Sequence, residues 1–135
     1  MHKTQLHIRF TDIDAFGHVN NATYLTYFEE ARVNFFDDVI DWSYDWTKEG
    51  VIVARAEIDY VMPAHFKDEI FIYTKCSRLG TKSFDLSYQM VKFHDGKEIL
   101  LADAVTVMVA FDYRSNKSIA VPEDWRTALQ ISIEK

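Results

Sequence analysis

The chain has 135 residues, a length that fits one domain (residues 1–135) with a core of its own. Hydrophobic residues make up 48% and charged residues 27%, a balance typical of globular proteins that argues against disorder. The net charge of −6 argues against non-specific binding to nucleic acid, because such binding needs basic groups that neutralise phosphates.

The single cysteine, Cys76, excludes an intrachain disulfide and a zinc site built from several cysteines. It lies in a strand-like segment, so we expect a small buried side chain rather than a nucleophile. The histidines lack the spacing of zinc ligands, so no metal is expected. No apolar stretch has the length of a signal peptide or a membrane span, which predicts a cytoplasmic protein without membrane insertion.

The first half of the chain predicts a strand, a loop and a long helix. Leu6, Ile8 and Phe10 alternate with polar residues, which indicates a short strand, and a polar loop follows over residues 12–19. From Asn20 to about Ile40, apolar residues recur at steps of three or four, as on one face of a helix: Tyr24, Tyr27, Phe28, Ala31, Phe35 and Val39. Asn20 or Asn21 is a good N-cap, and Leu25, Phe36 and Ile40 widen the stripe, so we expect burial on most of the helix surface.

The second half changes to period-two patterns. After an irregular connection over residues 41–50, we expect strands at 51–61, 69–79, 83–94 and 99–113, and a short helix at 122–131. Asp95-Gly96 predicts a tight hairpin turn, because this pair readily adopts positive φ angles. One long helix followed by a meander of strands predicts an α+β fold with an antiparallel sheet of about five strands wrapped around the helix. The edges left open on such a sheet favour dimerisation.

The residues before the long helix carry the chemistry. Two carboxylates, one histidine and two asparagines lie between Asp12 and Asn21. A helix N-terminus offers unpaired amides to an oxygen that becomes negative, and a nearby carboxylate can act as base or nucleophile. Thioester hydrolysis needs both components. The same residue types are also common in loops and caps, so this pattern alone leaves a structural role open.

The run from Arg9 to Arg32 closely resembles the signature of the 4-hydroxybenzoyl-CoA thioesterase family, whose members have the hotdog fold. Two later runs, residues 57–64 and 78–84, are also similar to that family, so that the resemblance covers about residues 6–113. It implies an acyl-CoA thioesterase without metal or cofactor, coenzyme A being part of the substrate. It also implies a homodimer or homotetramer with the active site at the dimer interface.

The resemblance assigns roles to particular residues. Asp14 corresponds to the catalytic carboxylate, acting as a general base or by direct attack, and the backbone N–H near Asn21 would polarise the carbonyl. His18 and Asn20 would shape the loop or contact the thioester. Tyr24 would line the acyl pocket, with a core position as the alternative.

Other residues have weaker assignments. Asp12 is expected to hold the loop through backbone amides, and Glu57 is a candidate second acid. The turn around Arg78, Lys82 and Ser83 is the candidate for binding the CoA phosphates, with an ordinary solvated turn as the alternative.

Three rival functions stay open at this stage. The first is an acyl-ACP thioesterase, although an acidic carrier would need a basic docking patch that the net charge of −6 does not favour. The second is a hydratase or dehydratase, which needs a catalytic His paired with an acid, a pattern not found around His18. The third is a non-catalytic acyl-CoA-binding protein, and the presence of Asp14 argues against it.

Overall fold

The computed structural model of the chain describes residues 1–41 and 47–134. Most of the predicted connection at 41–50, namely residues 42–46, therefore lies outside the described residues. The elements, in chain order, are β1 (His2–Leu6), the 3-10 helix η1 (Phe10–Asp12), α1 (Thr23–Val39), β2 (Glu49–Tyr60), β3 (Ile70–Leu79), β4 (Ser83–His94), β5 (Lys97–Asp112), β6 (Lys117–Ser118) and α2 (Glu123–Glu134).

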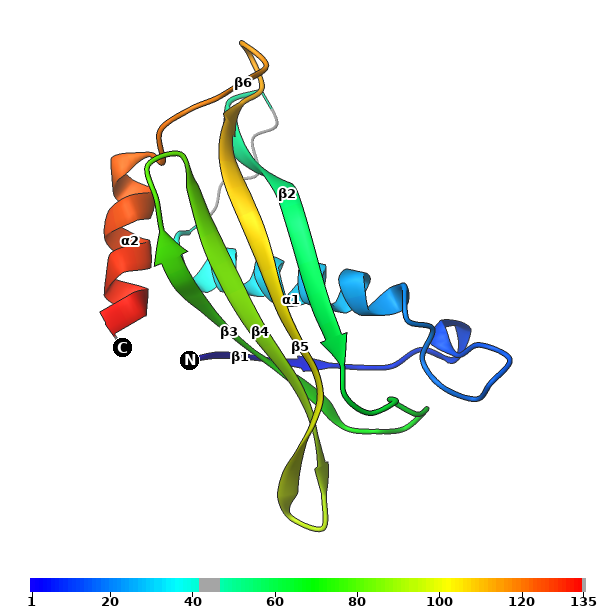
Figure 1. The fold of residues 1–135 in the computed structure, drawn as a ribbon. Helices are drawn as coiled ribbons and strands as arrows, with labels where there is room; N and C mark the ends of the chain where they lie inside the picture. Colours follow the sequence, from blue (N-terminus) through cyan, green and yellow to red (C-terminus); the bar gives the residue numbers. More distant parts are fainter. Residues whose placement is uncertain (42–46, 135) are drawn as a thin grey trace.

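The strands form an antiparallel sheet in the order β1-β3-β4-β5-β2, and the short β6 pairs with β5. Figure 1 shows α1 running across one face of this curved sheet, with α2 beside the turn that joins β3 to β4. The long hairpins follow from the period-two pattern of β3, β4 and β5, whose alternate residues are buried. The predicted α+β hotdog fold, a sheet wrapped around one long helix, is confirmed.

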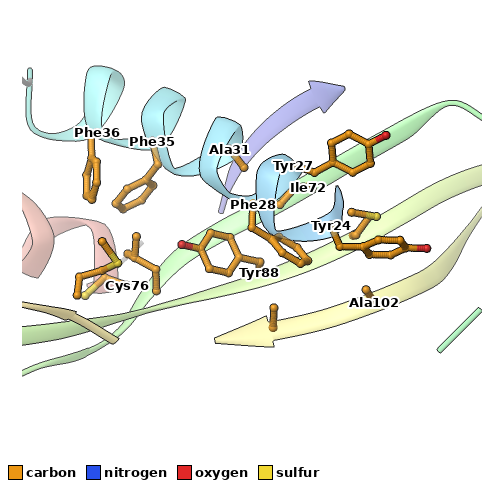
Figure 2. Close-up of a cluster of buried hydrophobic side chains, with 14 of the residues drawn as sticks. Tyr24, Tyr27, Phe28, Ala31, Phe35, Phe36, Ile72, Cys76, Tyr88 and Ala102 are labelled. Carbon is orange, nitrogen blue, oxygen red and sulfur yellow. The ribbon is translucent and has the colours of Figure 1, made fainter. Parts of the chain in front are cut away.

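The core lies between α1 and the inner face of the sheet. Apolar side chains of α1 at helical spacing are buried there, including Phe28 at 1% and Phe35 at 0% exposure. Burial of each such ring stabilises the fold by about 1.5–3 kcal/mol. Phe28 packs on Tyr88 of β4 with 5.1 Å between ring centroids. Figure 2 shows the hydroxyl oxygens of Tyr24 and Tyr27 extending away from this cluster, at the N-terminal end of α1.

The first strand and the start of the helix differ from the sequence prediction. The strand predicted from Leu6, Ile8 and Phe10 ends at Leu6, and Phe10 belongs to η1. The reason is local, because the Asp12 carboxylate accepts the Arg9 N–H at 3.0 Å and turns the chain. The helix begins at Thr23 with Ala22 as its N-cap, so neither asparagine is the N-cap residue. The Asn20 side chain does accept an amide two residues on, as predicted, but it does so in the turn before the helix.

The prediction that the long helix is buried on most of its surface is also wrong for this chain. Leu25 is 47% exposed and Val33 is 37% exposed. The sheet covers one face of α1 only, so residues outside the apolar stripe face outward. Strand ends elsewhere differ by one or two residues from the prediction, α2 extends to Glu134, and β6 was not predicted.

Smaller predictions are confirmed. Asp95 and Gly96 have φ angles of 52° and 74°, as a tight hairpin turn requires. Cys76 is 2% exposed, and burial raises the pKa of its thiol to about 11, so the thiolate is scarce at neutral pH.

Within residues 1–41 and 47–134, no helix has the length and apolar character needed to span a membrane.

Candidate functional site

The segment that leads into α1, residues 13–22, forms a tight hairpin that we call the entry loop. Ile13 and Val19 form an isolated antiparallel bridge, and the Asp14 N–H donates to the His18 carbonyl at 2.9 Å. Gly17 closes the turn with φ at 86° and donates its N–H to the Asp14 carbonyl at 3.1 Å. The side chain of Asp14 accepts the Phe16 N–H through Oδ1 at 2.9 Å. These bonds hold Asp14 at the tip of a defined loop.

The entry loop is attached to the rest of the fold at both of its ends. The Val19 N–H donates to the carbonyl of Ala64 at 2.8 Å, and the Asn20 N–H donates to the carbonyl of Asp12 at 2.9 Å. The Asp12 side chain, 3% exposed, accepts hydrogen bonds from Arg9 and from the hydroxyl of Tyr27 on α1. Asp12 was expected to bind backbone amides, but among the described residues its side chain accepts only one, that of Arg9, and its bond to the entry loop runs through its carbonyl.

The peptide groups at the start of α1 differ in their hydrogen bonding. Asn20 accepts the Ala22 N–H through its side-chain oxygen at 2.9 Å, and the Thr23 N–H through its carbonyl at 2.9 Å. Among the described residues, none accepts the Asn21 N–H. The carbonyl of Asn21 accepts the hydroxyl of Tyr60, on β2, at 2.9 Å. The Asn21 N–H, without an acceptor among the described residues, thus lies beside a helix N-terminus, where a developing negative charge is stabilised.

A pocket of about 310 Å³ lies beside that amide. Its wall consists of residues from the entry loop, α1 and the end of β2 with the segment after it: His18, Val19, Asn21, Tyr24, Tyr60, Val61, Met62 and Pro63. Tyr24 is 2% exposed, and its hydroxyl accepts the Ala64 N–H at 3.2 Å. Burial raises the pKa of Tyr24, so it stays a neutral phenol. Tyr24 therefore belongs to both the core and the pocket wall.

Five of the predicted site residues lie at this pocket or next to it. His18, Asn21 and Tyr24 line it. Asp14 does not line it but is hydrogen-bonded through its backbone to His18, and Asn20 fixes the turn that precedes α1. A carboxylate, an unpaired amide and an apolar pocket are the parts that acyl transfer requires.

Two residues at the pocket were not predicted. Tyr60 lines the pocket and packs on Tyr24 with 5.0 Å between ring centroids. His65 lies against His18 with ring centroids 5.5 Å apart. The alternation along β2 could have placed Tyr60 on the helix side of the sheet, but its contact with the entry loop is between residues far apart in sequence.

Glu57 does not reach the pocket. It lies three positions before Tyr60 on β2, and side chains at odd and even positions of a strand point to opposite faces. Its carboxylate instead binds the side chain of Arg55, and both are largely exposed.

The residues predicted to bind CoA phosphates lie at the other end of the sheet. Along β5, the partner of Ser83 is seven positions beyond the partner of Tyr60 (Val109 against Ala102), which corresponds to about 24 Å at ~3.4 Å per residue. Figure 1 shows this β3–β4 turn beside α2 and far from the entry loop. Arg78 there binds Ser83 at 2.8 Å and Asp85 at 2.9 Å, and Lys82 is exposed. Within one chain, the turn and the pocket do not come together.

A larger cavity of about 690 Å³ lies elsewhere, between the end of α1, β1, β3 and α2. None of the predicted site residues lines it, so size alone does not identify the site. Across the described part of the chain, no cluster of three or more His, Cys, Asp or Glu residues could hold a metal ion.

Comparison with known proteins agrees with this geometry. A sequence model of the thioesterase-like superfamily matches residues 8–129. The long-chain acyl-CoA thioesterase FadM of Escherichia coli is 30% identical over 95% of this chain and 96% of its own length. A thioesterase structure from Thermus thermophilus, complexed with coenzyme A and zinc, has a TM-score of 0.82 at 28% identity and covers 98% of this chain and 94% of its own.

The fold is shared more widely. A 4-hydroxybenzoyl-CoA thioesterase complexed with 4-hydroxybenzoyl-CoA has a TM-score of 0.86 at 20% identity, covering 94% of this chain and 96% of that one. The match of the family model over most of the chain, together with the hotdog fold and the FadM relative, shows that this chain belongs to the thioesterase-like superfamily.

Proposed function

We propose that this protein hydrolyses acyl-CoA thioesters to a free acid and coenzyme A, with Asp14 and the Asn21 amide as its catalytic groups. The observation that carries the proposal is that Asn21, whose N–H has no acceptor among the described residues, lines a pocket next to the loop that holds Asp14. FadM acts on long-chain acyl-CoA, and the Thermus structure contains coenzyme A, which supports a CoA thioester as the substrate.

The chemistry has two routes that these groups can serve. In the first, the Asp14 carboxylate takes a proton from water as the water oxygen attacks the thioester carbonyl. The carbonyl oxygen becomes negative and accepts the Asn21 N–H, and the C–S bond then breaks to release the CoA thiolate, which is protonated. In the second route, Asp14 itself attacks and expels the thiolate, and water then hydrolyses the mixed anhydride.

The side chain of Asp14 is compatible with both routes. Its Oδ1 accepts the Phe16 N–H, and within the described part of the structure Oδ2 has no hydrogen-bond partner. One oxygen therefore orients the carboxylate while the other remains available for water or for the carbonyl carbon. No metal or further cofactor is required by either route.

We also propose that the working unit is a homodimer or homotetramer with the pocket at the dimer interface. β2 forms one edge of the sheet, and its side chains include Ile52 at 41% and Val53 at 46% exposure. An open edge strand with exposed apolar residues favours pairing with another strand. A second copy also offers a way to bring the distant β3–β4 turn to the CoA end of the substrate.

The test is release of free thiol from short, long and aromatic acyl-CoAs by the wild type and by Asp14→Asn, with acyl-ACP measured in parallel. We expect turnover of at least one acyl-CoA and a loss of about 10² or more in kcat for the variant. Binding of acyl-CoA without turnover would identify a non-catalytic binding protein. Turnover of acyl-ACP alone would identify an acyl-ACP thioesterase. Full activity of Asp14→Asn would show that Asp14 is not catalytic.

A further inference from the structure

A hydrogen-bond network centred on the buried carboxylate of Asp12 lies next to the entry loop. Asp12 accepts three hydrogen bonds, from the Arg9 N–H at 3.0 Å, from Arg9 Nη2 at 3.0 Å and from the Tyr27 hydroxyl at 2.6 Å. Asp12 is 3% exposed and Tyr27 is also 3% exposed, so water does not compete for the bond between them. A buried carboxylate needs such partners, because an unpaired buried charge is strongly unfavourable.

The backbone of Asp12 connects this network to the end of the entry loop. Its carbonyl accepts the Asn20 N–H at 2.9 Å, so Asp12 is joined to α1 by its side chain and to the end of the entry loop by its main chain. Asp14 follows two residues later, and Asn21 follows Asn20. Asp14 is therefore two residues from Asp12 itself, and Asn21 is one residue from the amide that Asp12 binds.

We propose that Asp12 and Tyr27 form a positioning pair that fixes the entry loop on α1 and so sets the placement of Asp14 relative to the Asn21 amide. This role rests on the proposed function, since it concerns the same site. Neither residue lines the pocket, so the pair acts through the loop and not by contact with the substrate. A misplacement of catalytic groups by about 1 Å can lower the rate about 10²-fold, so loss of the positioning pair should have a measurable effect on kcat.

The ionisation of the pair agrees with this geometry. Burial by itself would raise the pKa of Asp12, but the hydrogen bonds from Tyr27 and Arg9 outweigh it and hold the pKa below the ordinary value. Burial and the bond to Asp12 raise the pKa of Tyr27. The groups that face Asp12 are Arg9, from the segment before η1, and Tyr27, from α1, while Glu30 acts on Arg9. The pair thus consists of a carboxylate and a neutral phenol at neutral pH.

The test compares Tyr27→Phe with Tyr88→Phe. Tyr88 is a matched control, because it is 0% exposed and its hydroxyl bonds Thr106 and Arg32 in the core without contacting the entry loop. We expect Tyr27→Phe to lower kcat by about tenfold or more while KM changes by less than about twofold. We expect both variants to lower the Tm by a similar amount, and Tyr88→Phe to keep the wild-type kcat.

Amide hydrogen exchange of residues 13–20 gives a readout that does not depend on turnover. Exchange there should become faster in Tyr27→Phe and stay at the wild-type rate in Tyr88→Phe. Wild-type kcat in Tyr27→Phe, or an equal loss of kcat in Tyr88→Phe, would overturn the proposal. If the wild type cleaves no thioester, the proposed function fails. The exchange rates then test the positioning pair by themselves, and unchanged exchange in Tyr27→Phe overturns it.

Discussion

The entry loop and the β3–β4 turn both gather polar residues at one end of an element, yet they use them in opposite ways. In the entry loop, the side chains of Asp14 and Asn20 accept backbone amides nearby, and this leaves the Asn21 amide without an acceptor among the described residues. In the turn, Arg78 is bound to Ser83 and Asp85, so the side chains satisfy one another. Polar side chains that bind the backbone thus shape the candidate site, whereas those of the turn bind one another.

Among the changes that test this comparison, Asn20→Ala should have the largest effect on kcat. Loss of the side-chain acceptor frees the Ala22 N–H and loosens the turn that presents the Asn21 amide, so kcat should fall by about tenfold, equivalent to ~1.4 kcal/mol of transition-state stabilisation. Steady-state kinetics with acyl-CoA measures this. Asn20→Asp keeps an acceptor and should retain most of the activity.

Asp112→Ala is the matched control for that change. Asp112, at the end of β5, accepts the Arg114 N–H two residues on at 2.9 Å, as Asn20 accepts that of Ala22, and it also accepts the Arg114 side chain at 3.0 Å. Both alanine variants should lose up to about 1–2 kcal/mol of stability, as loss of such a bond usually costs. Equal kcat in the two variants would show that the Asn20 bond only stabilises the fold.

The next largest effect concerns the turn. If a second copy brings Arg78 and Lys82 to the CoA phosphates, Arg78→Ala or Lys82→Ala should raise KM for acyl-CoA about fivefold and leave kcat unchanged, since an exposed ion pair contributes up to about 1 kcal/mol. The same variants should not change KM for a thioester of pantetheine, which lacks the nucleotide. Lys97→Ala, at the first residue of β5, is the control. A similar rise with both substrates would contradict binding of the nucleotide end.

These regions also differ in what the sequence could predict. The helix stripe, the β3 to β5 hairpins and the Asp95-Gly96 turn follow local periodicity and turn chemistry, so they were predicted to within a few residues. The loop before α1 was recognised because its residues are adjacent in sequence. The sequence predicts that α1 begins at Asn20, but it begins at Thr23, because the side chain of Asn20 bonds Ala22 in a turn before the helix.

Contacts between distant segments were beyond local patterns. The bond from Tyr60 to the Asn21 carbonyl and the contact of His65 with His18 depend on how β2 and the segment after it pack on the entry loop. The placement of Glu57 on the opposite strand face depends on which residues of β2 face the helix. The separation of the β3–β4 turn from the pocket likewise depends on strand register, which local periodicity does not give.

The smallest expected effect tests the long-range contact most directly. Tyr60→Phe keeps the ring against Tyr24 and removes only the hydroxyl that holds the Asn21 carbonyl. A net hydrogen bond contributes about 0.5–1.5 kcal/mol, so kcat should fall about threefold, with the acyl pocket unchanged in shape.

Tyr113→Phe is the control for this change, because its hydroxyl donates to the carbonyl of Val51 at 3.0 Å, near the other end of β2. It removes the same kind of bond from the same strand and should leave kcat at the wild-type value. A threefold loss in both variants would mean that kcat responds to the anchoring of β2 as a whole. A loss in Tyr60→Phe alone would mean that kcat depends on how the peptide carrying the Asn21 carbonyl is held. In that case β2 anchors the entry loop directly, whereas the β3–β4 turn of the same chain lies too far away to do so.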